Sequence, residues 1–249
     1  MTDGTTAITS EIAVPPVALA IGSHPDDIEF GCGATLAKWA DRGAEIHLLI
    51  LTDGAKGSWD EDDDLDALIT RRQGEARAAA RELGSESVFF LGFVDGELES
   101  GTEERARVCE VIRQVRPSIV LGHDPWKRYR LHPDHRHAGW LTVDGIVAAR
   151  DPHFYPGVGG PHHRPDALLL FEADDPNHVE QIDATFSNKV AALLAHRSQW
   201  RSTMDIEAGQ PREAEGREAF AARIRSQALA DGKLADGGLG EAFRLMTDL

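Results

Sequence analysis

Short apolar runs alternate with longer segments of helical periodicity along most of this 249-residue chain. Residues 17–22 (VALAIG) suit a strand buried on both faces, and residues 33–42 (GATLAKWADR) have helical spacing before a glycine. Repeats of this kind predict an α/β fold, a Rossmann-like parallel sheet with helices on both faces. Further strands are expected at 45–51, 87–93, 118–122 and 167–172, and further helices at 70–83, 103–115, 134–150 and 179–195.

The same pattern indicates a single domain over residues 1–249, with no internal repeat or linker. Its core is expected at about residues 15–200, interrupted by a Pro/Gly/His-rich loop at 151–165. From residue 201 onward the chain is polar and irregular, apart from a helix expected around 217–230. This C-terminal extension either caps the core or becomes ordered in a homo-oligomer, and the sequence leaves both readings open.

Net charge and composition limit the classes of molecule that this protein is expected to bind. The formal net charge is −16, which disfavours nucleic acid and anionic membranes. Residues 1–11 are polar and do not resemble a secretory signal, and no apolar run approaches the ~20 residues of a membrane helix. The two cysteines, Cys32 and Cys109, are far apart, so no disulfide framework is expected. We therefore expect a cytoplasmic protein whose partner is a small molecule.

Two short motifs follow two of the expected strands. HPDD, residues 24–27, comes directly after the first strand, and HPDH, residues 132–135, follows the fourth strand after a short loop. In a doubly wound sheet these strands are commonly neighbours where the connections reverse direction, and ligands bind outside their carboxyl ends. The two motifs are therefore expected to converge on one metal site at the C-terminal strand ends.

The residue types in these motifs suit metal-assisted hydrolysis. Two histidines and one carboxylate are a suitable ligand set for zinc and leave a position for water, whose pKa falls to about 7. A second carboxylate can act as general base and later protonate a leaving amine. The spacing does not decide whether Asp26 or Asp27 is the ligand. Taken singly, each motif could also be a capped turn in which Pro and Asp initiate a helix.

Six segments make the chain recognisable. They are SHPDDIEFGCGATLAKW (23–39), LTDGAKGS (51–58), RRQGEARAAARELG (71–84), FLGFVDGEL (90–98), HPDHRHAG (132–139) and AHRSQ (195–199). With them, residues 17–199 resemble the zinc-dependent N-acetylglucosaminyl deacetylase family, which includes the PIG-L, LmbE-like and mycothiol- and bacillithiol-pathway enzymes. The resemblance implies hydrolysis of the N-acyl amide, above all the N-acetyl amide, of a small molecule that contains an amino sugar. The products would be a free amine and acetate.

The resemblance also implies a metal centre. His24, Asp27 and His135 would bind Zn²⁺, and Asp26 would be the general base. Fe²⁺ is the alternative metal, because two histidines and a carboxylate also suit Fe(II).

Five other residues receive roles from the resemblance alone. His132 would be the cation that stabilises the tetrahedral oxyanion, with Asp134 orienting it. Arg72 and Asp95 match positions associated with holding the sugar hydroxyls. Tyr129 would help to polarise the substrate carbonyl, although its spacing to HPDH is one residue longer than in the family.

Other interpretations stay open from the sequence. Arg72 suits a helix-surface ion pair, Asp95 an ordinary turn, and His123 a structural role. A nucleotide-binding Rossmann protein is disfavoured because the first strand is followed by GSHPDD and not by a glycine fingerprint. The remaining rivals are an amidase acting on a thiol conjugate of such a sugar, a non-haem iron oxygenase and a catalytically silent metal-binding module.

Overall fold

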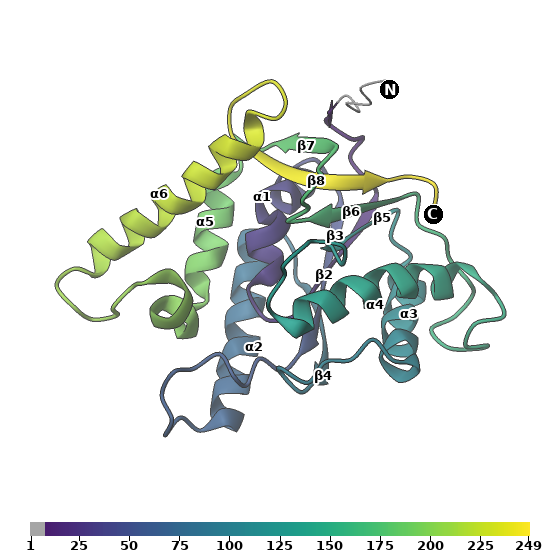
Figure 1. The fold of residues 1–249 in the computed structure, drawn as a ribbon, viewed down its shortest axis with the longest axis horizontal. Coiled ribbons are helices and arrows are strands. Elements are labelled where there is room, and N and C mark those ends of the chain that lie inside the picture. Colours follow the sequence, from purple (N-terminus) through teal and green to yellow (C-terminus); the bar gives the residue numbers. More distant parts are fainter. Residues whose placement is uncertain (1–7) are drawn as a thin grey trace.

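The computed structural model describes residues 8–249. Its strands, in chain order, are β1 (Thr9–Ser10), β2 (Val17–Gly22), β3 (Glu45–Thr52), β4 (Ser87–Phe93), β5 (Ile119–His123), β6 (Ala167–Phe171), β7 (His178–Gln181) and β8 (Gly240–Met246). They form one sheet in the order β1-β7-β8-β6-β5-β2-β3-β4 (Figure 1). The neighbouring pairs from β6 to β4 are all parallel, as the sequence predicts.

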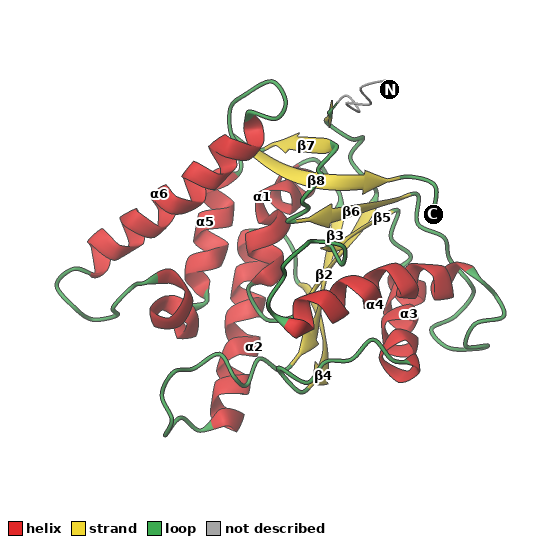
Figure 2. Cartoon of the chain, in the orientation of Figure 1, coloured by secondary structure: helices red, strands yellow, loops and turns green. Residues whose placement is uncertain are grey.

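Helices cover both faces of this sheet (Figure 2). The α-helices of the described chain are α1 (Asp27–Asp41), α2 (Leu65–Glu82), α3 (Thr102–Val115), α4 (Pro133–Arg150), α5 (Phe186–Ala195) and α6 (Glu213–Gly232). Side chains of α1, α2 and α5 share one apolar core with the sheet, and side chains of α3 and α4 share the other. The predicted fold class, a Rossmann-like α/β sheet between two helical layers, is therefore confirmed.

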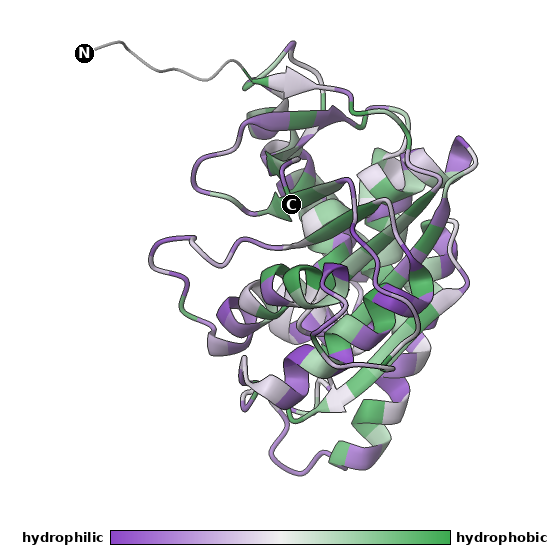
Figure 3. Cartoon of the chain, turned by 90° about the vertical axis from the view of Figure 1, so that its right-hand side faces the viewer, coloured by the Kyte–Doolittle hydropathy of each residue, from purple (hydrophilic) through white to green (hydrophobic). Residues whose placement is uncertain are grey.

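β2 and β6 are apolar along their whole length, and β5 is apolar up to its last residue, His123, because both of their faces are covered. Every residue of β5 and β6 is buried, and Figure 3 shows hydrophobic strands inside a more hydrophilic shell of helices and loops. Apolar residues on alternate faces of β2, such as Ala18 and Leu19, belong to the two different cores. None of the helices in residues 8–249 is long and apolar enough to cross a membrane.

The C-terminal part of the chain differs from the sequence prediction. The helix expected at 179–195 is the strand β7 followed by the helix α5, and β8 was not expected at all. β8 pairs antiparallel with both β6 and β7, so the sheet is mixed and not wholly parallel. α6 packs on α5 (Figure 1), where Phe220 joins Leu193 and Trp200 in a third apolar cluster. In this structure the extension is therefore part of the folded unit.

α1 begins six residues earlier than the helical spacing indicates. It starts at Asp27 and is interrupted at Cys32, whose φ of −150° and ψ of 17° are not helical. At Gly31 the chain passes so close to the ring of Phe171 that a Cβ atom would lie 2.5 Å from it. The part of α1 after the interruption is mostly apolar and was predicted from the sequence. The first turn, which carries Asp27, was not predicted.

Candidate metal centre

The two motifs converge because β2 and β5 are neighbours. These strands pair in parallel, with Ala18 opposite Ile119, so the segments after their carboxyl ends lie side by side. His24 lies just beyond β2, and His135 lies in the first turn of α4. At Gly139 a Cβ atom would be only 2.8 Å from the carbonyl oxygen of His123, so a larger residue would push α4 away from the end of β5.

His24, Asp27 and His135 form a group with the geometry of a metal site. One ligand atom from each lies within 4.8 Å of the others. Asp27 Oδ1 is 3.3 Å from His135 Nε2, and Asp27 Oδ2 is 3.3 Å from His24 Nδ1. Asp27 Oδ2 also accepts the backbone N–H of His24 at 2.7 Å, which fixes the carboxylate. Two imidazole nitrogens and one carboxylate oxygen are a donor set that suits Zn²⁺ or Fe²⁺.

The second ring nitrogen of His24 is held by two carboxylates. Nε2 lies 3.1 Å from Asp95 Oδ1 and 3.2 Å from Asp134 Oδ2. Carboxylates in this position orient a metal-binding histidine and leave its other nitrogen for the metal. Burial lowers the pKa of His24, but its bonds with Asp134, Asp27 and Asp95 raise the pKa well above the usual value overall. The surroundings thus favour positive charge at this point, which also suits a bound cation.

Asp26 is strained and almost completely buried. Its φ of 113° is unusual for any residue other than glycine, and such strain is found mainly where the surrounding structure requires it, often at functional sites. Burial raises the pKa of Asp26 to about 6, with the charge of Arg72 acting against this shift and that of Asp27 adding to it. A carboxylate whose pKa lies near neutrality is suited to general base catalysis.

Arg72 is buried in the inner face of α2, so the alternative of a surface ion pair is wrong. Its guanidinium donates to the carbonyl oxygens of Gly54 and Pro25, each at 2.7 Å, and lies 3.7 Å from Asp26 Oδ1. Arg72 therefore links the backbone of the loop after β2 to that of the loop after β3. Asp95 is likewise more than part of a turn, because its Oδ2 accepts the N–H of Lys56 at 3.0 Å.

Asp134 lies close to both His24 and His132, with one ligand atom of each residue within 4.8 Å of the others. Its carboxylate accepts the N–H groups of Gly96 at 2.6 Å and Leu98 at 3.3 Å. Within residues 8–249 no hydrogen bond joins Asp134 to His132. Burial and the charges of His24 and His135 lower the pKa of His132, although the carboxylates of Asp134 and Asp95 act against this shift.

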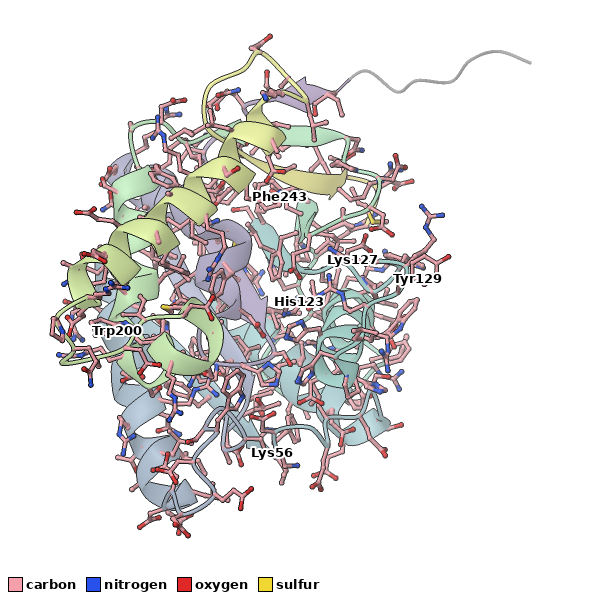
Figure 4. All side chains as sticks on the ribbon, turned by 60° about the vertical axis from the view of Figure 1, so that its left-hand side comes forward. Lys56, His123, Lys127, Tyr129, Trp200 and Phe243 are labelled. Atoms are coloured by element: carbon pink, nitrogen blue, oxygen red, sulfur yellow. The ribbon has the colours of Figure 1, made fainter. Side chains whose placement is uncertain are left out.

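A pocket of about 480 Å³ opens onto these groups, a size that suits a small ligand. Among the predicted residues, Asp26, Arg72, Asp95 and His132 line it together with the three metal-ligand candidates. Tyr129 does not: its side chain is 93% exposed, and Figure 4 shows it at the edge of the molecule, away from His123. The structure therefore does not bring Tyr129 into the site.

His123 lines the same pocket, although the sequence suggested a structural role for it. Its Nε2 is 3.3 Å from Asp27 Oδ2 and its Nδ1 is 3.3 Å from Glu172 Oε2. Burial acts against ionisation of Glu172, but His123 and Arg130 lower its pKa to about 2. The positions of His123 and Glu172 in the sequence could have indicated that they lie near the site. His123 ends β5 and Glu172 directly follows β6, at the same edge of the sheet.

Comparison with known proteins identifies the family of this chain. The sequence pattern of the PIG-L family, described as GlcNAc-PI de-N-acetylase, matches residues 19–146, which include both motifs. Diacetylchitobiose deacetylase from Thermococcus kodakarensis is 37% identical over 185 residues, 73% of this chain and 69% of that protein. The 1D-myo-inositol 2-acetamido-2-deoxy-alpha-D-glucopyranoside deacetylase of Mycolicibacterium vanbaalenii is 31% identical over 230 residues, 73% of this chain and 80% of that protein.

A solved structure indicates the same family. The structure of N,N'-diacetylchitobiose deacetylase from Pyrococcus horikoshii, complexed with its inhibitor MPG, superimposes with a TM-score of 0.82 at 30% identity. The match covers 94% of this chain and 84% of that one. Sequence pattern, relatives and fold therefore agree, and the chain belongs to the PIG-L family of de-N-acetylases.

Proposed function

We propose that this chain hydrolyses the N-acetyl amide of a small molecule that contains an amino sugar. The observation that carries the proposal is the convergence of His24, Asp27 and His135 beside a buried, strained Asp26 in one pocket. The names of the two relatives support the choice of substrate, since both are deacetylases of compounds with an N-acetylated amino sugar.

Within this proposal, His24, Asp27 and His135 hold one divalent metal, and we favour Zn²⁺ over Fe²⁺ because the proposed reaction is not a redox reaction. When bound, the metal would act as a Lewis acid and make hydroxide available near neutral pH. Asp95 and Asp134, through Nε2 of His24, would fix the orientation of that ligand.

Asp26 would carry the proton. It removes a proton from water as the water oxygen bonds to the amide carbon, and it returns that proton to the nitrogen as the C–N bond breaks. The products are acetate and the free amino sugar. His132 would donate a hydrogen bond to the carbonyl oxygen as that oxygen becomes negative, which a neutral imidazole with one N–H can also do.

The sugar would occupy the pocket of about 480 Å³. Arg72 and Asp95 line it, but much of their hydrogen-bonding capacity is used within the protein, by Gly54, Pro25, His24 and Lys56. We therefore propose that both residues act first by positioning the site, and that any contact with sugar hydroxyls is additional.

The test is a panel of N-acetylated sugars incubated with the metal-loaded chain. The panel contains N-acetylglucosamine, N,N'-diacetylchitobiose and the inositol-linked N-acetylglucosaminide, and release of free amine and acetate is measured. Amine release that a chelator stops and added Zn²⁺ restores is the expected result. Cleavage of thiol conjugates alone would identify the alternative amidase. Dioxygen uptake with Fe²⁺ would identify an oxygenase, and no turnover of any compound would leave a metal-binding module.

A further inference from the structure

A second group of potential metal ligands lies beside the first. It consists of His123, His135 and Glu172, whose ligand atoms also lie within 4.8 Å of one another. Two imidazoles and a carboxylate are again a set that suits Zn²⁺. His135 belongs to both groups, so a metal bound in the second would compete for a ligand of the first.

The guanidinium of Arg130 lies among the three residues of this second group. Its Nη1 atom is 2.7 Å from Glu172 Oε2, 3.2 Å from His123 Nδ1 and 3.4 Å from His135 Nδ1. Only 5% of the Arg130 side chain is exposed. A single nitrogen of a permanent cation thus contacts every member of the group.

A zinc ion bound by His123, His135 and Glu172 and the guanidinium of Arg130 cannot occupy the same position. A zinc ion needs its ligand atoms at about 2.0–2.2 Å, so it would occupy the volume of Nη1. Repulsion between the two positive charges adds to the steric conflict. Within residues 8–249, Nε and Nη2 of Arg130 are buried without a hydrogen-bond partner. Arg130 therefore stays here chiefly through its one charged contact with Glu172 and not through a full set of bonds.

Arg130 also affects the first group through His123. Nδ1 of His123 lies 3.2 Å from Nη1 of Arg130 and 3.3 Å from Oε2 of Glu172, and its Nε2 lies 3.3 Å from Oδ2 of Asp27. Oδ2 is thus engaged by His123 and by the backbone of His24, which leaves Oδ1 on the side of His135.

We propose that Arg130 is a resident cation that blocks a second Zn²⁺ site formed by His123, His135 and Glu172, and so keeps the centre mononuclear. The inference rests on the proposed function only in that it takes His24, Asp27 and His135 as the productive metal site. Its consequence is protection of His135 from a competing ion.

The test measures zinc bound to the full chain without substrate. His24→Ala removes a ligand of the first group but none of the second, so competition for His135 disappears. The single variant is expected to bind about zero zinc after dialysis, and His24→Ala with Arg130→Met about one per chain. Adding Glu172→Gln to that pair should abolish the regained site. Zinc is counted by mass spectrometry and by calorimetric titration, and folding is checked by thermal unfolding.

Two matched controls accompany these variants. In the His24→Ala background, Arg130→Lys keeps the positive charge in place, and Arg128→Met removes a 77% exposed arginine from the same loop. Neither should regain zinc. Arg130→Gln replaces Arg130→Met if the latter does not fold. Equal zinc content in His24→Ala with and without the neutral substitution at 130 would overturn the proposal. Failure of the proposed function would be seen elsewhere, as no amine release by the wild-type chain.

Discussion

Nε2 of His24 lies 3.1 Å from Oδ1 of Asp95, in the turn that follows β4. The resemblance to the deacetylase family implied that Asp95 holds sugar hydroxyls. Because of this contact with His24 we propose a different role, since an outer carboxylate that accepts a ring N–H fixes the orientation of a metal-binding histidine. Loss of a substrate contact raises KM, whereas loss of a metal-orienting contact weakens zinc binding. Measurements of KM and of zinc affinity therefore distinguish the two roles.

Asp95→Asn is expected to weaken zinc binding by about 10–100-fold, the usual effect of losing an outer carboxylate. The amide keeps the size of the side chain, so the pocket should keep its shape. Zinc affinity is measured by competition with a chelator of known affinity. Glu97→Gln, on the same turn with a 66% exposed side chain, is the control and should bind zinc normally. Normal zinc affinity combined with a raised KM would return Asp95 to the role of sugar contact.

His135→Ala should remove both metal and turnover, since it deletes one of three proposed ligands. The loss of zinc affinity should exceed the about 10–100-fold expected for an outer partner. Metal content is determined after dialysis and compared with His137→Ala, two residues further along α4, where the ring contacts Ser100 instead. Full zinc occupancy in His135→Ala would disprove the ligand assignment.

Asp26→Asn should keep the metal and lose the reaction. The two side chains are nearly the same size, but the amide cannot take a proton from water, and general acid–base catalysis contributes about 10²–10⁴-fold. kcat is measured at saturating substrate, alongside zinc content. If the metal is lost, Asp26 is itself a ligand. Turnover close to that of the wild type would place the base elsewhere.

Arg72→Lys should lower the free energy of unfolding by about 1.5–3 kcal/mol, the range for a hydrogen bond to a charged group. A lysine keeps the charge but cannot present the guanidinium fork to the carbonyl oxygens of both Gly54 and Pro25. Chemical denaturation measures the change. Arg71→Lys, an exposed neighbour on α2, should have little effect. An unchanged stability with an increased KM would show that Arg72 mainly contacts the sugar.

Glu180 makes stability depend on pH at a site remote from the pocket. Its buried carboxylate accepts from His178 at 2.8 Å and from Ile12 N at 2.9 Å, and it pairs with Lys38. Burial acts to raise the pKa of Glu180, but these partners lower it overall. A pKa below the unfolded value stabilises the fold above the unfolded pKa of about 4.3. That contribution is lost as the pH falls through the lower, folded pKa.

Stability measured from pH 7 downward should therefore fall less steeply in Glu180→Gln than in the wild type. The substitution should also cost about 1–3 kcal/mol at neutral pH, because Lys38 loses a buried charged partner but keeps its contacts with Glu11 and the carbonyl oxygen of Gln181. Glu97→Gln, whose carboxylate is exposed, serves again as the comparison and should keep the wild-type pH dependence. Parallel curves for the wild type and Glu180→Gln would exclude this role.

The sequence predicted the parts of the site that lie in contiguous motifs. HPDD and HPDH each place several functional side chains within one turn of chain, and the pairing of β2 with β5 follows from the usual topology of such sheets. Periodicity also predicted most helices and strands, because the central strands are buried on both faces and are therefore mostly apolar.

What the sequence did not predict depends on contacts between distant segments. His123, Arg130 and Glu172 stand singly in loops or at strand ends, and no spacing links them. Only the pairing of β5 with β6 brings them together. The position of Asp134 depends in the same way on the backbone N–H groups of Gly96 and Leu98, which belong to another loop. Backbone donors have no signature in a sequence.

The order of the strands has a consequence for folding during synthesis. Among residues 8–249, β7 pairs with β1 on one side and with β8 on the other, so β8 joins β7 to β6. β8 follows β7 by more than fifty residues of chain. When β6 and β7 have left the ribosome but β8 has not yet been synthesised, one edge of each strand therefore lacks its partner. Unpaired edges of this kind attract other strands. The interval between translation of Gln181 and of Met246 is thus when the nascent protein is most exposed to wrong pairing.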